Sequence, residues 1–136
     1  MLDSDVLEAK IDIIDRNLNF LKDYSGVSEA QFLESYKDVQ AAKFSLLECI
    51  EACMDIANHI IASRRLRRPE GYAEAFEILG SEGIIDRKLA DGLGDMARFR
   101  NLLVHRYGEV DNKRVLSIVQ ENLGDIESFL ESVSKL

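Results

Sequence analysis

The segment from Arg100 to Tyr107 holds the side chains best suited to chemistry. Its functional groups are a guanidinium, a carboxamide, an imidazole and a phenol, at Arg100, Asn101, His105 and Tyr107. An arginine can neutralise a phosphate through two parallel hydrogen bonds. A histidine changes charge near neutral pH, so it can move the proton of a ribose 2′-hydroxyl or of a leaving oxygen. The set is therefore suited to cleaving a phosphodiester bond without a metal ion. Structural roles are the alternative: His105 could be a helix C-cap, and Tyr107 could be a core aromatic whose hydroxyl lies at the surface.

Arg100 stands in the apolar stripe of the helix that the spacing predicts around it. Successive helical residues turn by about 100°. Its neighbours on the stripe are Leu93, Met96, Leu103 and Val104. An arginine is almost never buried without a partner. We therefore expect Arg100 to pair with a buried carboxylate, to reach past the edge of the bundle, or to bind an anionic ligand.

Asn101 and His105 point together on this helix, but about 100–140° away from Arg100. A straight helix therefore cannot bring Arg100 and His105 to one ligand. Convergence requires the helix to end near Val104, or a second copy of the chain to bring its own motif close. Gly108, shortly afterwards, favours such an ending.

Periodic apolar residues predict the helices that would position this segment. With one proline, eight glycines and no internal repeat in 136 residues, we expect one all-α domain over 1–136, a bundle of about five helices. The widest apolar face belongs to the longest helix, which is expected at the centre of the bundle or against a second subunit. The first expected helix spans about 3–23, and a second helical region begins at a Ser28–Gln31 capping box and bends near 35–36. The longest helix is expected over 37–66, and a short one over 70–80 is closed by Gly80. Two more are expected, one over 87–104 with Asp86 as its N-cap and a last one from the cap Asp111 to about 134.

Charge and hydropathy exclude several classes of protein. No apolar stretch approaches the roughly 18 residues of a membrane span, and the N-terminus lacks the features of a signal peptide. We predict a cytoplasmic protein in which Cys49 and Cys53 are free buried thiols. The net charge of −8 argues against nucleic-acid binding. Residues 60–114, however, carry 11 basic and 9 acidic side chains, against 6 and 16 elsewhere, so the positive field is local to the motif.

Other polar residues are weaker candidates. Arginines near the motif are either solvated or contact RNA phosphates; they are Arg64, Arg65, Arg67, Arg68 and Arg106. His59, one turn after Asp55, is a satisfied interior histidine, part of a dimer seam, or a residue lining the RNA cleft. Two thiols and one nearby imidazole are too few for a structural zinc site, so we expect no metal and no cofactor.

The motif resembles that of a known family. Arg100-x4-His105-x-Tyr107 matches the RX4HXY pattern of the HepT-like proteins, a branch of the HEPN superfamily. Residues 55–60 resemble the central helix of that family, and 69–79 resemble its connector, with Tyr72, Phe76 and Leu79 at the matching places. The resemblance covers nearly the whole chain.

The resemblance implies a fold, an activity and a partner. HepT-like proteins are helical bundles that form homodimers, with the two motifs meeting in a cleft, and they act as metal-independent RNase toxins of prokaryotic toxin–antitoxin modules. The usual antitoxin is a small nucleotidyltransferase of the MntA type, which in studied members adds AMP to the motif tyrosine, here Tyr107. Arg100 would bind the scissile phosphate, and His105 would be the general acid/base. Asn101 would orient the histidine or the phosphate, and Tyr107 would support the site.

Three hypotheses follow from the sequence. The first is an endoribonuclease toxin. The second is a non-catalytic helical binding module that helps a nucleotidyltransferase partner to recognise its substrate. The third is a purely structural helical dimer.

Overall fold

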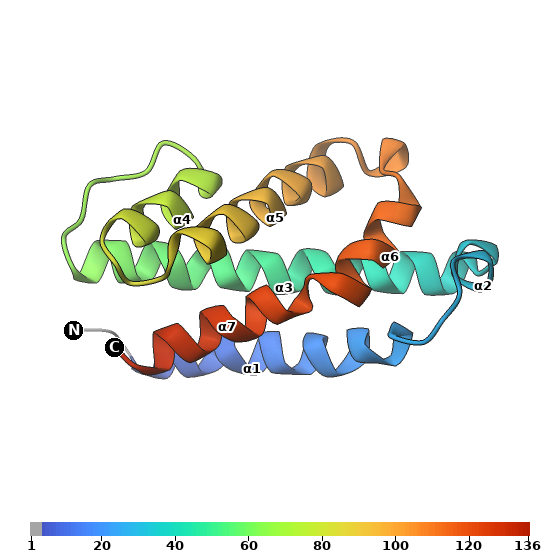
Figure 1. Ribbon diagram of the computed structural model, residues 1–136, viewed down its shortest axis with the longest axis horizontal. Helices are drawn as coiled ribbons and strands as arrows, with labels where there is room; N and C mark the ends of the chain where they lie inside the picture. Colours follow the sequence, from blue (N-terminus) through green and yellow to red (C-terminus); the bar gives the residue numbers. More distant parts are fainter. Residues whose placement is uncertain (1–3) are drawn as a thin grey trace.

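The computed structural model describes residues 4–136, which form helices and no β-strand. The prediction of an all-α bundle is confirmed. Figure 1 shows a long central helix, with α1 and α7 along one side of it and α4 and α5 along the other. The elements are α1 (Ser4–Leu21), the 3-10 helix η1 (Lys22–Tyr24), α2 (Glu29–Glu34), α3 (Tyr36–Ser63), α4 (Tyr72–Ser81), α5 (Arg87–His105), the 3-10 helix η2 (Tyr107–Glu109), α6 (Asn112–Glu121) and α7 (Leu123–Ser134).

Helix α3 is central because apolar residues cover a wide part of its surface. Its 28 residues span about 42 Å at 1.5 Å per residue. Helices α1, α4, α5 and α6 all pack against it, which confirms the central place that its wide apolar face predicts. Cys49 and Cys53 lie on its buried side as free thiols, as expected. Burial raises the pKa of the Cys49 thiol to about 12, and that of Cys53 is also raised, so both stay protonated near neutral pH.

Two serines set the start of the second and third helices. The predicted capping box is present, with Gln31 N donating to Ser28 Oγ at 3.2 Å and Ser28 N to Gln31 Oε1 at 3.4 Å. Ser35 is extended, at φ −98° and ψ 97°, and its hydroxyl accepts from Asp38 N at 3.1 Å. The bend expected near 35–36 is therefore a break between two separate helices.

Helix α3 ends at Ser63, three residues before the predicted end. Arg65 has φ 55°, and Leu66 N donates to Ile61 O at 3.0 Å while Arg65 N donates to Ala62 O at 3.2 Å. These two bonds form a Schellman motif, in which the left-handed position is usually a glycine. The arginines of 64–68 therefore form the loop after α3 and not its last turn.

Helix α4, in contrast, ends one residue later than predicted, at Ser81. Gly80 lies inside the helix, and the closing residue is Gly83 at φ 73°, where Ile84 N donates to Leu79 O at 3.0 Å. Gly80 instead permits close packing against α5, because a Cβ there would lie 2.8 Å from the Cβ of Ala90. This packing matters for the site, since α4 and α5 each contribute to it.

The last predicted helix is two helices. Asp111 caps the first as expected, its Oδ1 accepting from Lys113 N at 3.0 Å. The chain then turns at Asn122, at φ −117° and ψ 0°, and α7 begins at Leu123. The short α2 and this break explain why the described residues contain more helices than the expected five.

One apolar core joins the helices. The rings of Phe76 and Phe129 meet edge to face at 5.7 Å and connect α4 to α7. Within residues 4–136, no helix has both the length and the apolar content that crossing a membrane requires. The N-terminal residue of the predicted first helix, residue 3, lies outside the described part of the chain.

Candidate functional site

Helix α5 positions Arg100 through its buried face. Asp86 caps the helix by accepting from Leu89 N at 2.8 Å, and Leu93, Met96 and Leu103 anchor it in the core. Because Arg100 lies on the same stripe, its side chain is drawn against α3 and α4 and is only 15% exposed. The arrangement follows from the helical period, as the sequence predicts.

The Arg100 guanidinium is held from three directions. Its Nε and Nη2 both lie 3.3 Å from Oε1 of Glu51 on α3. Nη1 donates to Oδ1 of Asn101 at 3.2 Å, and the Tyr72 ring at the start of α4 lies 5.0 Å from Cζ. Of the alternatives for Arg100, pairing with a carboxylate is therefore present, although the Glu51 side chain is 43% exposed and not buried.

These contacts leave part of the guanidinium available. Arginine has five N–H groups, and the contacts with Glu51 and Asn101 use three of them. One N–H on each terminal nitrogen is not used within residues 4–136. A pair of N–H groups of this kind can donate two parallel hydrogen bonds to a phosphate.

Tyr107 lies in η2, after the end of α5, and is anchored to a different part of α3. Its hydroxyl donates to Gln40 Oε1 at 3.1 Å. Lys43 Nζ donates to the Tyr107 carbonyl oxygen at 3.0 Å and lies 3.9 Å from the centre of the ring. Burial, with Tyr36 as the second cause, raises the pKa of the Tyr107 phenol, so this hydroxyl is neutral near pH 7.

Arg100 and Tyr107 are anchored at separate places along α3. The α3 residues that anchor Arg100 and Tyr107 are Glu51 and Gln40, which are about 16 Å apart along the helix axis. His105 is the last residue of α5 and is exposed. Asn101, expected to orient the histidine or the phosphate, binds the Arg100 guanidinium.

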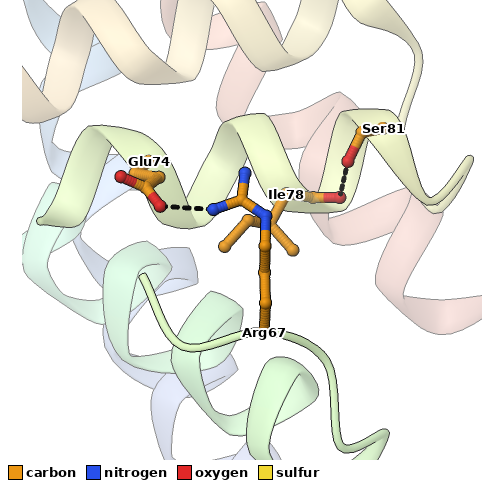
Figure 2. A network of polar contacts seen from close by, with 4 residues as sticks. All are labelled: Arg67, Glu74, Ile78 and Ser81. Carbon is orange, nitrogen blue, oxygen red and sulfur yellow. Dashed lines mark hydrogen bonds and ion pairs between the residues drawn. The ribbon is translucent and has the colours of Figure 1, made fainter. Parts of the chain in front are cut away.

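The arginines predicted to contact RNA lie in different parts of the structure. Arg106 is exposed and lies 3.4 Å from Glu109. Arg67 reaches across to Glu74 on α4, where Ser81 Oγ also donates to Ile78 O at 3.0 Å (Figure 2). Arg64, Arg65 and Arg68 are exposed in the loop after α3.

His59 is half-buried on α3, one turn after Asp55. The Asp55 carboxylate accepts from Lys10 Nζ on α1 at 2.8 Å. Within residues 4–136, no three His, Cys, Asp or Glu side chains gather as a metal ion would require.

The sequence did not indicate which residues of α3 contact the motif. Glu51, Gln40 and Lys43 contact motif residues that lie between 49 and 67 positions away in the chain. The only signal in the sequence is the spacing of Gln40, Phe44, Leu47 and Glu51, which places them on one face of α3. Tyr72 was singled out, but its contact with Arg100 was not.

Comparisons with known proteins bear directly on this site. The model of the family described as Ribonuclease HepT-like matches residues 14–133. The mRNA nuclease HepT of Shewanella oneidensis is 32% identical over 130 residues, which cover 96% of this chain and 97% of that protein. The tRNA nuclease HepT of Aphanizomenon flos-aquae is 25% identical over 129 residues, covering 95% and 88%.

The fold has a solved counterpart with a partner. A structure of a tri-AMPylated Shewanella oneidensis HEPN toxin in complex with MNT antitoxin aligns with a TM-score of 0.89 and 31% identity, covering 97% of this chain and 98% of that one. The family that the RX4HXY motif indicated is thereby confirmed. The chain carries the motif on α5 and η2, and it belongs to the Ribonuclease HepT-like family.

Proposed function

We propose that this protein is an endoribonuclease that acts as the toxin of a toxin–antitoxin pair in the cytoplasm. The observation that carries the proposal is Arg100, a mostly buried cation with two unused N–H groups, on the helix that ends in an exposed His105. Its relatives are named as nucleases of mRNA and of tRNA, so the substrate class is RNA.

In the proposed reaction, His105 removes the proton of a ribose 2′-hydroxyl. The 2′-oxygen attacks the adjacent phosphorus, the bond from phosphorus to the 5′-oxygen breaks, and that oxygen takes up a proton. The products are a cyclic phosphate and a 5′-hydroxyl end. Arg100 neutralises the charge that develops on the phosphate oxygens, which is the role that a metal ion has in other nucleases. Arg106, beside His105, contributes a cation at the same end of α5, where it is paired with Glu109 at 3.4 Å.

A second copy of the chain completes the cleft in this proposal. Between the anchors of Tyr107 and Arg100, the exposed face of α3 carries Phe44, which is 61% exposed, and Tyr36 at its start is 79% exposed. Large exposed apolar side chains favour contact with another protein surface. A homodimer formed on this face would bring two motif segments to one RNA strand, which a single chain does not do.

The proposed partner is a small MntA-type nucleotidyltransferase antitoxin. A relative with 31% identity is tri-AMPylated and in complex with such an antitoxin. In this chain the acceptor is the Tyr107 hydroxyl, which lies beside the motif and is half-buried. An added phosphate brings negative charge to the site and repels the RNA backbone.

RNA cleavage in the presence of EDTA tests the proposal. We expect the wild-type protein to cut single-stranded RNA without added metal, and Arg100→Ala and His105→Ala to abolish the cut. Arg98→Ala is the matched control, because Arg98 is an exposed arginine of α5 whose ion pairs are with Asp95 and Glu77. Equal residual cleavage in wild type and in both motif variants contradicts the nuclease. Tight binding of the nucleotidyltransferase without any cleavage would favour the non-catalytic binding module.

A further inference from the structure

The arginines of the loop after α3 do not share one environment. Arg67 is turned to α4 and binds Glu74 (Figure 2). Arg64 lines a hollow formed with residues from the two ends of the chain, among them Leu7 and Leu136. Arg65 and Arg68 line a separate cavity of 440 Å³ against the end of α3. The loop therefore places two of its four arginines together in one cavity.

This cavity combines positive charge, an amide and apolar surface. Its polar lining is Arg65, Arg68 and Asn58, and its apolar lining is Ile61, Ala62, Leu66 and Pro69. Neither arginine has an acidic partner in the part of the chain that the structure describes. The volume lies within the range of about 300–1,000 Å³ found for small-molecule sites. Two unpaired guanidiniums suit a phosphate, and the amide and apolar surface suit a sugar and a base.

The backbone at Arg65 points to a role for its side chain. The residue has φ 55°, a left-handed conformation that disfavours side chains and that glycine adopts freely. The Schellman motif at the end of α3 requires this conformation, so glycine would close the helix with less strain. Helix termination alone therefore does not account for an arginine at this position.

The cavity lies in line with Arg100 along α3. Asn58 follows Glu51, the partner of Arg100, by seven residues, which places it two turns further on the same face, about 10 Å away. Pro69, also in the lining, comes three residues before Tyr72, whose ring lies 5.0 Å from the Arg100 guanidinium. A strand with a phosphate at Arg100 would reach the cavity with a neighbouring nucleotide.

We propose that this cavity is a subsite for one nucleotide of the RNA strand, adjacent to the scissile phosphate. Arg65 and Arg68 bind its phosphate, Asn58 hydrogen-bonds to the sugar or base, and the base covers the apolar surface of Leu66 and Pro69. The inference rests on the proposed ribonuclease function, since it takes RNA as the ligand of Arg100.

Binding of RNA to a chain that cannot cut it tests the subsite. The full chain carries His105→Ala, and its affinity for a short fluorescent single-stranded RNA is measured by anisotropy over a range of salt concentrations. We expect Arg65→Gly combined with Arg68→Ala to weaken binding about tenfold or more. The slope of log affinity against log salt is expected to fall by about 0.7 for each lost phosphate contact.

Two variants serve as controls. Arg64→Ala removes an arginine of the same loop that faces the other hollow, and it is expected to keep the affinity and the salt slope of its parent. Arg65→Gly places glycine in a conformation that glycine prefers, so a loss of binding is not a loss of fold; the melting temperature verifies this. Equal weakening by Arg64→Ala, or no weakening by the Arg65 and Arg68 variants, overturns the proposal.

A free nucleotide is distinguished from RNA in the same assay. If AMP binding depends on Arg65 and Arg68 while RNA affinity does not, the cavity is a mononucleotide site and the proposal is wrong. Cleavage by the chain with His105 intact is scored separately. If that chain does not cut RNA while the Arg65 and Arg68 variants still lose RNA binding, the proposed ribonuclease activity is contradicted and the proposed RNA-binding role of the cavity is supported.

Discussion

Arg100 is positioned by residues from three helices. Glu51 on α3 and Asn101 on α5 take three of its N–H groups, and the ring of Tyr72 on α4 lies 5.0 Å from its Cζ. A long side chain with many rotamers is thereby restricted to one orientation. This restriction lowers the entropy that would be lost when the guanidinium binds a phosphate.

Tyr72→Leu tests this positioning. The contact between an arginine and an aromatic ring contributes about 0.5–2 kcal/mol. We therefore expect kcat for RNA cleavage to fall about twofold to thirtyfold, at about 1.4 kcal/mol for each factor of ten. Tyr72→Phe keeps the ring and is expected to keep the wild-type rate. If both variants lose the same activity, or if the loss follows a fall in stability measured by urea unfolding, the ring does not position Arg100.

Tyr107 is the residue at which we expect modification. Its hydroxyl carries its proton near pH 7 and donates it to Gln40 Oε1 at 3.1 Å, and burial raises the pKa of this phenol further. After co-expression with the nucleotidyltransferase, intact mass is expected to rise by whole AMP units, and Tyr107→Phe is expected to prevent the rise. Peptide mapping locates the adduct, and AMP found on Tyr36 or Tyr72 would contradict the assignment.

At the scale of elements, the contact between α4 and α5 sets the site. Helix α4 begins with Tyr72 and α5 carries Arg100, so their separation decides whether the ring reaches the guanidinium. Gly80 lets the two helices approach, because a Cβ at this position would lie 2.8 Å from the Cβ of Ala90. Neither of these Cβ positions can move without moving a helix backbone.

Gly80→Ala is expected to be destabilising although alanine has the higher helix propensity. Overpacking of this kind typically lowers the free energy of unfolding by about 1–3 kcal/mol. Gly124→Ala is the control, because no atom lies within 4 Å of a Cβ built there in α7, and a helical glycine replaced by alanine gains up to about 1 kcal/mol. Urea unfolding measures the free energy of unfolding of both variants. Stabilisation by both substitutions would show that α4 and α5 separate at little cost.

At the scale of the whole molecule, the site is spread along α3. The partners of Arg100 and Tyr107 are about 16 Å apart on this helix, and exposed Phe44 lies between them. A second copy packed on this face would bury the apolar side chains and place its own His105 near the first chain. The acidic total of the chain does not prevent RNA binding, since the basic residues gather in 60–114.

Phe44→Asp is expected to convert a dimer into a monomer of 15.4 kDa and to abolish RNA cleavage. The cause is the cost of placing an unpaired carboxylate in an apolar interface. Leu136→Asp introduces a carboxylate at an exposed apolar residue that lies with Ser63 and Arg64 at the opposite end of α3, and it should keep the dimer. Light scattering after gel filtration gives the mass. A monomeric wild type that cleaves RNA would contradict the composite cleft.

The sequence predicted most helix starts correctly but not all helix ends. The capping serine and aspartate residues, Ser28, Asp86 and Asp111, were predicted correctly because a cap bonds to a backbone N–H two or three residues away. The end of α3 was predicted too late, because the pattern 64–68 contains no glycine and Arg65 takes the left-handed conformation in its place. Likewise, no glycine or proline at Asn122 indicated that the chain turns there and divides the last predicted helix in two.

By itself, the sequence determined the all-α class and most of the helices, the apolar stripe that holds Arg100 and the motif that indicates the family, because each depends on residues a few positions apart. Only the tertiary structure decided that Glu51 holds Arg100, that Gln40 and Lys43 hold Tyr107, and that Arg65 and Arg68 share a cavity while Arg67 does not. Such contacts join positions far apart in the chain, and helical periodicity gives the face that a residue occupies but not the residue of another helix that meets it.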